Sequence, residues 1–381
     1  MFLLAGVLWL LAAVRNTLHL RALRDLAPSA PGADTASPMV SVVIAARDEE
    51  AHLERAVRSW LSQGGVDLQI IVADDRSGDR TPTIAQRLEA EDGRVEHARI
   101  DTLPRGWLGK CNALRAGAER ARGAWIVFAD ADTELIASDA VARAVALGRA
   151  EDADHVCLVP RMPGRTVWAR ALTCSFILGV LDRLAGLNHD RPRGYFGIGA
   201  FNMVRAEAYR AAGGHEPLRL EVLDDINLGA LMRRGGGVSR ARLARDAVAT
   251  TWGGTIRELM SVLEKNTFAV VGYRVWLVGL VFIAFATLWG AAIAGPIVAV
   301  ATGSWFGVAP AVGFALNAIP GALMARRLGF EPIAGALAPV STPIFLIAGL
   351  RSMILTLARG GVRWRDTFYP LADLRAGRYR G

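Results

Sequence analysis

Two carboxylates, Asp130 and Asp132, lie one residue apart at the end of an apolar segment. Side chains at this spacing after a strand can converge on one divalent ion if the backbone turns there. Mg²⁺ and Mn²⁺ favour carboxylate oxygens and take further oxygen ligands from substrate phosphates. Such a metal bridges the phosphates of a nucleotide diphosphate and neutralises charge on the leaving group. The pair therefore predicts a metal site, with a solvated loop or a helix cap as the alternative.

A second acidic pair, Asp74 and Asp75, follows another apolar segment. A carboxylate at the end of a strand can accept hydrogen bonds from a base N–H or a ribose hydroxyl. Capping of the next helix is the alternative, and it accounts well for Asp79. It leaves the adjacent pair at the strand end unexplained.

Lys110 follows a glycine-punctuated loop and opens a predicted helix. The helix dipole disfavours a cation at this position, so a bound anion is expected to compensate. A diphosphate is the natural candidate, because helix N-termini bind phosphates. The alternative is a surface lysine at a turn. Only two of the 44 basic residues are lysines, Lys110 and Lys265, which suggests that these positions need a compact, flexible ammonium.

A third acidic pair, Asp224 and Asp225, precedes a predicted helix over 226–234. Transfer of a group to a hydroxyl needs a carboxylate that takes the hydroxyl proton. Capping of the helix is the alternative for one aspartate. The other aspartate is then free for chemistry.

These side chains need a scaffold, and alternating apolar segments predict one. Strand and helix signals alternate regularly, which predicts an α/β fold with a doubly wound parallel sheet. Ligands of such sheets bind at the carboxyl ends of the strands, where the first two acidic pairs fall. Strands are predicted at 39–46, 68–73, 94–100, 124–129, 155–160 and 196–205, and helices at 49–63, 79–91, 110–121, 137–149 and 165–187.

Apolar residues make up 52% of the 381 residues and concentrate outside this α/β region. Residues 1–20 predict an uncleaved transmembrane anchor followed by a linker over 21–38. Arginines after the anchor place the catalytic domain, residues 39–255, in the cytoplasm of a bacterial-type cell. An interfacial amphipathic helix is expected within 256–274, a multi-pass membrane region with two to three spans over 275–357, and a basic tail over 358–381.

The last apolar segment, 333–357, creates a conflict. A full span would place the arginine-rich tail outside, against the positive-inside rule. Pro339 and Pro343 permit a re-entrant or interfacial segment instead, which favours a cytoplasmic tail. The net charge of +8 fits an anionic membrane surface as partner and needs no nucleic acid. The three cysteines have no metal-ligand spacing.

Taken together, six segments resemble the family 2 glycosyltransferases, which have a GT-A fold. Their order and spacing match over about residues 39–250, and they read VSVVIAARDEE, IIVADDRSGDRT, GWLGKCNAL, FADADTEL, GIGAFNMVRAEAYRAAGGHE and LDDINLGALMRRGG. The N-terminal anchor, the GWxGK loop and the C-terminal apolar segments resemble a membrane-bound subgroup. This subgroup includes ceramide glucosyltransferases and the hopanoid-associated and carotenoid-acid transferases.

The resemblance implies an inverting transfer of a sugar from a nucleotide-diphosphate sugar, expected to be a UDP-sugar, to a lipid-like acceptor. It implies that Asp74 and Asp75 hold the nucleoside and that Glu49 and Lys110 belong to the donor site. It also implies that Asp130 and Asp132 hold the diphosphate and Mg²⁺ or Mn²⁺. Asp225 would be the general base, with Asp224 beside it.

Two departures from the family pattern matter. The usual Glu-Asp pair is Asp224-Asp225 here, so which residue is the base stays open. The Gln/Arg-x-x-Arg-Trp motif of many relatives is absent, and RELMSVLEKN occupies its place, so Lys265 is expected to supply the cation. This favours transfer of one sugar over the alternative, a processive polysaccharide synthase.

Other functional classes fit the sequence less well. A nucleotidyltransferase on a similar α/β domain would carry a glycine-rich basic loop after its first strand, where this chain has AARDEE. A non-enzymatic membrane scaffold would not need the Asp-Ala-Asp, Lys110 and Asp225 together. A transporter would need more spans and buried charge pairs.

Overall fold

The computed structural model describes residues 1–28, 38–192, 194–252 and 254–379. Residues 29–37, half of the predicted linker over 21–38, lie outside these residues. The chain forms two compact units, each discontinuous in sequence. We call them the sheet unit, residues 23–162, 186–251 and 372–381, and the helical unit, residues 1–22, 163–185 and 252–371.

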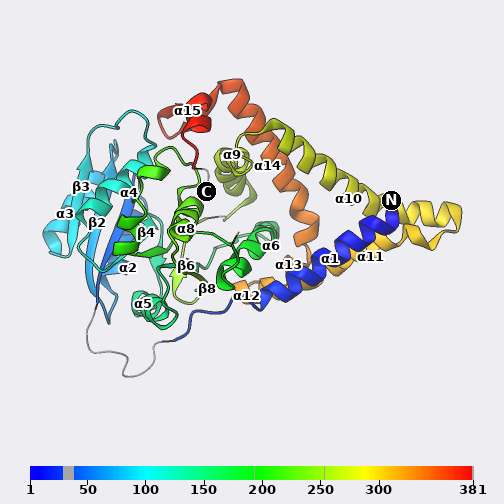
Figure 1. The fold of residues 1–381 in the computed structure, drawn as a ribbon, viewed down its shortest axis with the longest axis horizontal. Helices are drawn as coiled ribbons and strands as arrows, with labels where there is room; N and C mark the ends of the chain where they lie inside the picture. The colour runs from blue at the N-terminus through cyan, green and yellow to red at the C-terminus, as the bar shows by residue number, and fades with distance from the viewer. Residues whose placement is uncertain (29–37, 193, 253, 380–381) are drawn as a thin grey trace. The chain divides into compact units, whose positions relative to one another are not determined.

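The sheet unit is built on seven strands in the order β3-β2-β1-β4-β7-β6-β8 (Figure 1). The first four in this order pair in parallel, as the sequence predicts. The prediction of a wholly parallel sheet is wrong at β7, which runs antiparallel to both neighbours because its chain enters from the opposite end. The strands are β1 (Met39–Ala46), β2 (Asp67–Asp75), β3 (Val95–Ile100), β4 (Trp125–Asp130), β6 (His155–Val159), β7 (Asn202–Arg205) and β8 (Ser239–Leu243).

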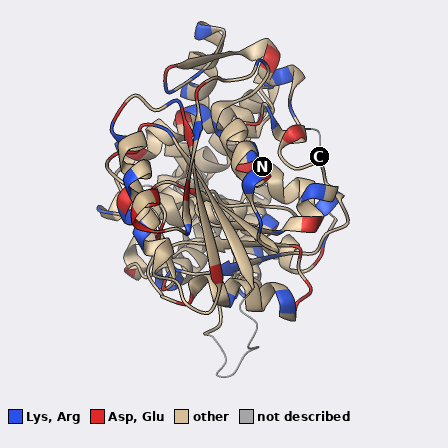
Figure 2. Cartoon of the chain, turned by 90° about the vertical axis from the view of Figure 1, so that its left-hand side faces the viewer, with Lys and Arg blue, Asp and Glu red and all other residues tan. Residues whose placement is uncertain are grey.

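Helices cover both faces of this sheet. Alternate residues of β1 point to opposite faces, so Val42 packs in one hydrophobic core and Val43 in another. The Val42 core holds α2 (Leu53–Leu61), α3 (Thr81–Glu91) and α5 (Ala140–Ala150), and the Val43 core holds α4 (Gly109–Arg120), α7 (Ala206–Ala211) and α8 (Asp224–Arg234). Figure 2 shows that positions occupied by Lys, Arg, Asp or Glu fall mainly on helices and loops, with few along the strands.

Two short strands bring distant loops together next to the sheet. β5 (Glu134–Leu135) pairs antiparallel with β9 (Val248–Ala249). This pairing places residues 250–251 beside the loop that follows β4. After β7 the chain also forms the short helix η1 (Glu216–Leu218) before α8.

Among its described residues, the helical unit contains helices and one hairpin. Its elements are α1 (Phe2–Leu20), α6 (Val167–Asn188), α9 (Ile256–Val270), α10 (Val275–Thr302), η2 (Trp305–Gly307), α11 (Ala309–Leu316), α12 (Ala318–Leu328), α13 (Pro332–Ala336), α14 (Ala338–Arg359), and the hairpin β10 (Gly361–Trp364) with β11 (Thr367–Pro370). Helix α6 ends in the sheet unit, and α15 (Leu371–Ala376) leads the chain back to it.

Small residues let these helices approach closely. A Cβ on Gly6 would meet the backbone of Ala309, and a Cβ on Gly295 would meet the backbone of Gly307. Close contacts at glycine are typical of helices that pack in a bilayer.

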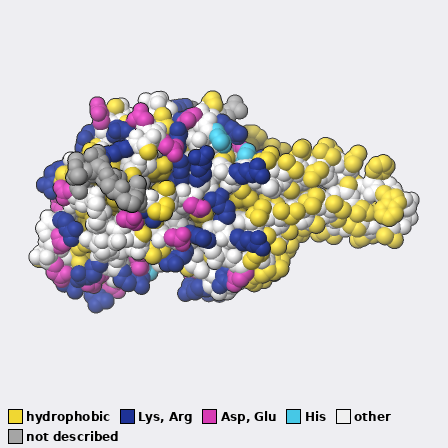
Figure 3. All heavy atoms as spheres, turned by 90° about the horizontal axis from the view of Figure 1, so that it is seen from below, with side chains coloured by type: hydrophobic (Ala, Val, Ile, Leu, Met, Phe, Trp, Pro, Cys, Tyr) yellow, Lys and Arg dark blue, Asp and Glu magenta, His cyan; other side chains and the backbone are white. Residues whose placement is uncertain are grey.

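Within the described residues, five helices are long and apolar enough to cross a membrane, which indicates a membrane protein. They are residues 2–20, 167–188, 275–302, 305–328 and 338–359. Figure 3 shows hydrophobic side chains gathered over the outer surface of the helical unit.

Candidate active site

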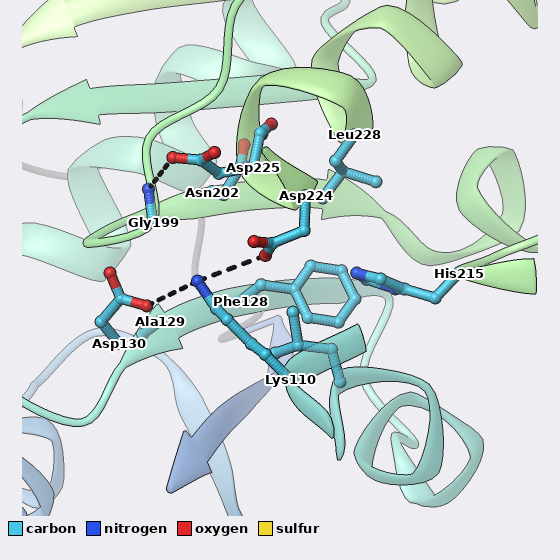
Figure 4. A pocket seen from close by; sticks show the side chains of 11 residues that line it. Lys110, Phe128, Ala129, Asp130, Gly199, Asn202, His215, Asp224, Asp225 and Leu228 are labelled. Atoms are coloured by element: carbon cyan, nitrogen blue, oxygen red, sulfur yellow. Dashed lines mark hydrogen bonds and ion pairs between the residues drawn. The ribbon is translucent and has the colours of Figure 1, made fainter. Parts of the chain in front are cut away.

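Lys110 is the centre of a charged pocket at the carboxyl ends of β1 and β4. Its Nζ lies 2.8 Å from Asp130 Oδ1 and 3.2 Å from Asp224 Oδ2 (Figure 4). Burial opposes the charge on Lys110, but Asp130, Asp224 and Asp225 outweigh it and raise the pKa of this ammonium well above its usual value. Lys110 therefore stays charged and joins two of the three acidic pairs found in the sequence.

The backbone explains why Lys110 meets Asp224. Helix α4 begins at Gly109, and the turn before it is tied to the segment before α8. The Leu108 N–H donates to the Arg219 carbonyl at 2.7 Å, and the Cys111 thiol lies 3.4 Å from the Glu221 carbonyl. The first turns of the two helices therefore face each other.

Asp130 ends β4 next to a glycine that leaves room for it. The Asp130 N–H donates to the Gly199 carbonyl at 2.9 Å. A Cβ on Gly199 would meet the Asp130 carboxylate, so any larger residue here would displace that side chain. With glycine at this position, the Asp130 carboxylate keeps its place in the lining of the pocket.

Asp132 lies two residues further on and is held from the β9 side. Its Oδ2 accepts hydrogen bonds from the Thr250 hydroxyl at 3.2 Å, from the Thr251 N–H at 3.3 Å and from the Thr251 hydroxyl. These bonds fix one oxygen of the carboxylate. The threonines at 250–251 were not singled out in the sequence.

The Asp130 and Asp132 carboxylates supply hard oxygen donors, which fit Mg²⁺ or Mn²⁺. Among the residues that the structure describes, no group of three or more His, Cys, Asp or Glu side chains could hold a metal ion. A cation on these two aspartates would therefore complete its coordination with phosphate and water oxygens.

Asp225 is held by backbone donors at the start of α8. Its Oδ2 accepts from the Gly199 N–H at 3.0 Å and its Oδ1 from the Ile226 N–H at 2.8 Å. Burial and the charge of Asp224 raise its pKa to about 6, although Lys110 acts in the opposite direction. A carboxylate with this pKa can take up a proton near neutral pH.

Neither aspartate of this pair caps α8. Leu223 occupies the N-cap position, and no side chain makes a capping hydrogen bond there. The capping alternative raised by the sequence is therefore wrong. Both carboxylates face the pocket instead, Asp224 toward Lys110 and Asp225 toward Gly199.

Asp74 is buried inside the protein at the end of β2. It receives hydrogen bonds from Arg99 at 2.5 Å, from His97 at 3.3 Å and from the Ser77 N–H at 3.1 Å. Burial alone would raise its pKa, but these bonds outweigh burial and lower the pKa to about 2. The carboxylate is therefore a fixed anion with its partners already in place.

Asp75 is also nearly buried, between two arginines. Arg76 donates to both of its oxygens, at 2.8 and 2.9 Å, and Arg47 lies 3.4 Å away. A Cβ on Gly109 would collide with the Asp75 carboxylate, so Asp75 lies against the start of α4. The Asp75 carboxylate thus lies next to Gly109, the residue that precedes Lys110.

The remaining predicted residues lie elsewhere. Glu49 follows β1, and its N–H donates to the Thr81 hydroxyl at 2.8 Å. Lys265 belongs to the helical unit, where its Nζ lies 3.7 Å from the ring centroid of Trp364. Neither residue lines the pocket around Lys110.

Asn202 and His155 lie near Asp225 but were not predicted as site residues, although Asn202 belongs to the GIGAFN segment that resembles the family. Asn202 donates to the Asp225 carbonyl at 3.1 Å and lies 2.6 Å from His155. Burial lowers the pKa of His155 to about 4, so this imidazole is neutral. The glycines and asparagine of GIGAFN are the pattern that could have revealed this part of the site, because a Cβ on Gly197 would overlap the Asp225 carbonyl.

His215 was also missed as a pocket residue, and Glu221 lies in the segment just before α8. His215 lines the pocket and lies 2.6 Å from the Tyr209 hydroxyl. Glu221 accepts hydrogen bonds from the Asn227 amide at 2.9 Å and from the Tyr379 N–H. Burial raises the pKa of Glu221 to about 7.

Comparison with known proteins shows which family and fold the chain resembles. The family model described as Glycosyl transferase family 2 matches residues 41–213. The chain is 33% identical over 99 residues to the GalNAc(5)-diNAcBac-PP-undecaprenol beta-1,3-glucosyltransferase of Campylobacter jejuni, which covers 26% of this chain and 31% of that protein. It is 38% identical over 96 residues to the 4,4'-diaponeurosporenoate glycosyltransferase of Staphylococcus haemolyticus, covering 25% and 24%.

A longer alignment joins the chain to the beta-monoglucosyldiacylglycerol synthase of Trichormus variabilis, with 26% identity over 200 residues, 50% of this chain and 40% of that protein. The matched regions thus span between about a quarter and two fifths of these relatives. Among solved structures, the mannosyltransferase PcManGT from Pyrobaculum calidifontis, in complex with GDP-Man and Mn²⁺, matches with a TM-score of 0.54 and 19% identity, covering 93% of this chain and 99% of that one.

These findings confirm two predictions from the sequence. The resemblance to the family 2 glycosyltransferases is confirmed by the family model. The α/β fold of GT-A type is confirmed by the solved neighbour, and long apolar helices are present at the N-terminus and in the C-terminal part.

Proposed function

Because residues 41–213 form a family 2 glycosyltransferase domain, we propose that the protein transfers a single sugar from a nucleotide-diphosphate sugar to a lipid-like acceptor at a membrane. The observation that carries this proposal is the convergence on Lys110 of Asp130, from the Asp-Ala-Asp, and Asp224, next to Asp225. Donor-binding and proton-accepting groups thereby border one pocket.

The proposed reaction is a direct displacement with inversion. Asp225 takes the proton of the acceptor hydroxyl, and the freed oxygen pair forms the new bond to the anomeric carbon. The bond from that carbon to the phosphate oxygen breaks, and the nucleotide diphosphate leaves with the bonding pair. The pKa of about 6 suits Asp225 to this role, because the carboxylate is ionised at neutral pH and still basic.

Lys110 and the Asp-Ala-Asp serve the leaving diphosphate. We propose that Lys110 exchanges its contact with Asp130 for a phosphate oxygen when the donor binds. Asp130 and Asp132 would hold Mg²⁺ or Mn²⁺, which when bound neutralises charge on the diphosphate. The hydrogen bonds from Thr250 and Thr251 would hold the Asp132 carboxylate in a fixed orientation for this role.

Two observations support a lipid-like acceptor. The curated relatives named above include transferases whose names specify an undecaprenol-linked and a diacylglycerol acceptor. Five apolar helices would bring such an acceptor to the enzyme from the bilayer. We further propose that the donor is a UDP-sugar and that the group transferred is a hexosyl unit. The protein would be multi-pass, with its catalytic domain in the cytoplasm.

The test is sugar transfer in membranes that contain either the wild-type chain or Asp225→Asn. We expect a loss of about 10²–10⁴-fold, the usual contribution of a general base. Asp246→Asn is the matched control, because Asp246 is an exposed aspartate of the same unit, and it should keep full activity. Wild-type rates in Asp225→Asn at equal protein level would overturn the assignment of the base.

The nucleotidyltransferase alternative predicts a different product. It would join a nucleoside triphosphate to a sugar phosphate and release pyrophosphate, whereas a glycosyltransferase consumes the nucleotide sugar and releases a nucleotide diphosphate. Identification of the released phosphate compound in two assays, one with a nucleotide sugar and acceptor and one with a nucleoside triphosphate and a sugar phosphate, separates the two reactions.

A further inference from the structure

We propose that α1, α10 and the pair α11–α12 cross the bilayer, whereas α6 and α14 lie flat on its surface, on the side of the sheet unit. Together with α9 and the β10–β11 hairpin, α6 and α14 would form a layer that contacts the headgroup boundary of the bilayer. The inference rests on the membrane attachment proposed above and goes beyond it, because helix length and composition alone qualify all five helices as spans.

The first argument comes from the path of the chain. It passes between the two units after residues 22, 162, 185, 251 and 371. A folded body with a hydrogen-bonded sheet and charged surface does not sit inside hydrocarbon, so the sheet unit lies on one side of the bilayer. Any segment that leaves this unit and returns to it must therefore cross an even number of times.

Each return is fixed by hydrogen bonds inside the sheet unit. After α1, the Leu243 N–H donates to the Arg24 carbonyl at 2.9 Å. Before and after α6, the Arg161 N–H donates to Val248 and the Ala241 N–H donates to the Asn188 side chain, both at 2.8 Å.

The C-terminal residues that follow residue 371 are also held to the sheet unit by specific contacts. The Tyr379 N–H donates to the Glu221 carboxylate, and Arg234 lies over the Tyr379 ring at 5.3 Å from its centroid. Residues on both sides of the 252–371 segment therefore belong to one folded body.

This rule decides the two ambiguous helices. The segment 163–185 contains a single long helix, α6, so α6 does not cross. The segment 252–371 contains three candidates, and an even number of crossings leaves one of them out. Helix α10 and the pair α11–α12 form a hairpin with a short connection and no Asp, Glu, Lys or Arg before Arg326, so α14 is the helix that stays at the surface.

Packing within the helical unit agrees with this assignment. The start of α14 lies beside α6, where the Ser175 hydroxyl donates to the Ala338 carbonyl at 2.6 Å. Its second half lies beside α9, where the Phe268 N–H donates to the Ser352 hydroxyl at 3.1 Å. Helix α9 leads into the start of α10, and α13 joins the end of α12 to α14, so α14 connects two points on the same side of the α10–α12 hairpin (Figure 1).

Charge gives a second, independent argument. Arg351 lies past the middle of α14 and Arg359 at its end, and both pair with Glu264 of α9, at 3.1 and 3.0 Å. Three charges in the hydrocarbon core would be expensive, whereas a helix at the boundary places them among headgroups. Exposed Ile347 and Ile354 lie on the same face as Arg351, as expected of a helix whose arginine extends to the polar surface.

The hairpin after α14 has the composition of a membrane boundary. Trp364 carries Lys265 over its ring, and Arg363 and Arg365 are exposed beside it. Tryptophan and basic side chains concentrate where lipid headgroups meet water. At the opposite end of the α10–α12 hairpin, Trp305 and Phe306 are exposed, which fits the far boundary.

The depth of α14 in reconstituted bilayers tests the inference. Val340, Ile347 and Ile354 are exposed and seven residues apart, so they share one face, and the outer two are separated by about 21 Å along a helix. Nitroxide labels at Val340→Cys, Ile347→Cys and Ile354→Cys should report equal, shallow depths. A depth that changes steeply along the series, as in a crossing helix, would overturn the proposal.

Sidedness gives the second measurement. The three native cysteines are buried, so the wild-type chain serves as the unlabelled control. In sealed vesicles, an impermeant maleimide should label Asp366→Cys and Asp246→Cys from one side and Ser304→Cys from the other. Labelling of Asp366→Cys from the side of Ser304→Cys would refute the topology. Release of the protein from membranes by alkaline carbonate would instead refute the membrane attachment in the proposed function.

Discussion

Asp74-Asp75 and Asp224-Asp225 are the same dipeptide in the same unit, yet their surroundings give them opposite properties. Asp74 receives hydrogen bonds from two cationic or polar side chains and a backbone N–H, and its pKa falls to about 2. Asp225 receives hydrogen bonds from two backbone N–H groups and faces a neighbouring carboxylate, and its pKa rises to about 6.

The difference follows from which charge each pair meets. Arg76 and Arg99 serve one aspartate each at the end of β2. At the start of α8, the single ammonium of Lys110 must serve Asp130 and Asp224 as well as the neighbouring Asp225. When each carboxylate of a pair has its own cation, both stay ionised and serve the fold. When the carboxylates share one cation, one of them can still take up and release a proton near neutral pH. Proton transfer is therefore expected at Asp225 and not at Asp74.

The largest expected effect comes from removing the shared cation. Lys110→Met keeps the approximate length of the side chain and removes the ammonium that contacts Asp130 and Asp224. We expect sugar transfer to fall by about 10²–10³-fold or more, the scale of losing one preorganised charge partner in an active site. The pKa of Asp225 should rise further, because the ammonium that lowers it is gone. The assay is initial-rate transfer at saturating donor.

Lys110→Arg is the matched variant. It keeps the positive charge but replaces a compact ammonium with a planar guanidinium. The pKa of Asp225 should therefore return close to its wild-type value, whereas the transfer rate should recover only in part. Equal rates for Lys110→Met and the wild-type chain would remove Lys110 from the donor site.

The next effect is on the pH profile. The base must be ionised, so kcat/KM should fall about tenfold per pH unit below pH 6 and level off above pH 7. The charge of Asp224 helps to raise the Asp225 pKa, so Asp224→Asn should move this acidic limb to lower pH, whatever its plateau. A limb that stays in place, or moves to higher pH, would show that the pair is not coupled as described.

The sequence predicts where several of these charged residues lie, because their positions at strand and helix ends depend on the local residue pattern. Apolar segments of strand length place Asp74 and Asp130 at strand ends, and the structure puts those ends at β2 and β4 as expected. The glycine loop before Lys110 likewise predicts the start of α4 at Gly109. These features need only neighbours in the chain.

The rest depends on register between distant strands. Phe128 of β4 pairs with Asn202 of β7, and this antiparallel register brings Gly199 to Asp130 and to Asp225. A sequence pattern does not fix which residues of two distant strands lie opposite each other. The partners of Asp132 and of Glu221 come from residues 118 and 158 positions away, which periodicity cannot reveal.

The smallest expected effect on activity, and the largest contrast in stability, comes from Asp74→Asn. Folding lowers the pKa of Asp74 from 3.8 to about 2, so the ionised form stabilises the fold by about 2 kcal/mol. This contribution is present above pH 4 and is lost as the pH falls from about 4 to about 2. Asp74→Asn should therefore lower the free energy of unfolding by about 2 kcal/mol at pH 7, while transfer at saturating donor and low temperature falls less than in Lys110→Met. Asp225→Asn should lower the transfer rate strongly without lowering the free energy of unfolding, because it removes a carboxylate whose ionisation is disfavoured by burial. Thermal unfolding in detergent, measured beside transfer rates, checks both variants. A loss of stability in Asp225→Asn equal to that in Asp74→Asn would mean that the two pairs serve the fold alike.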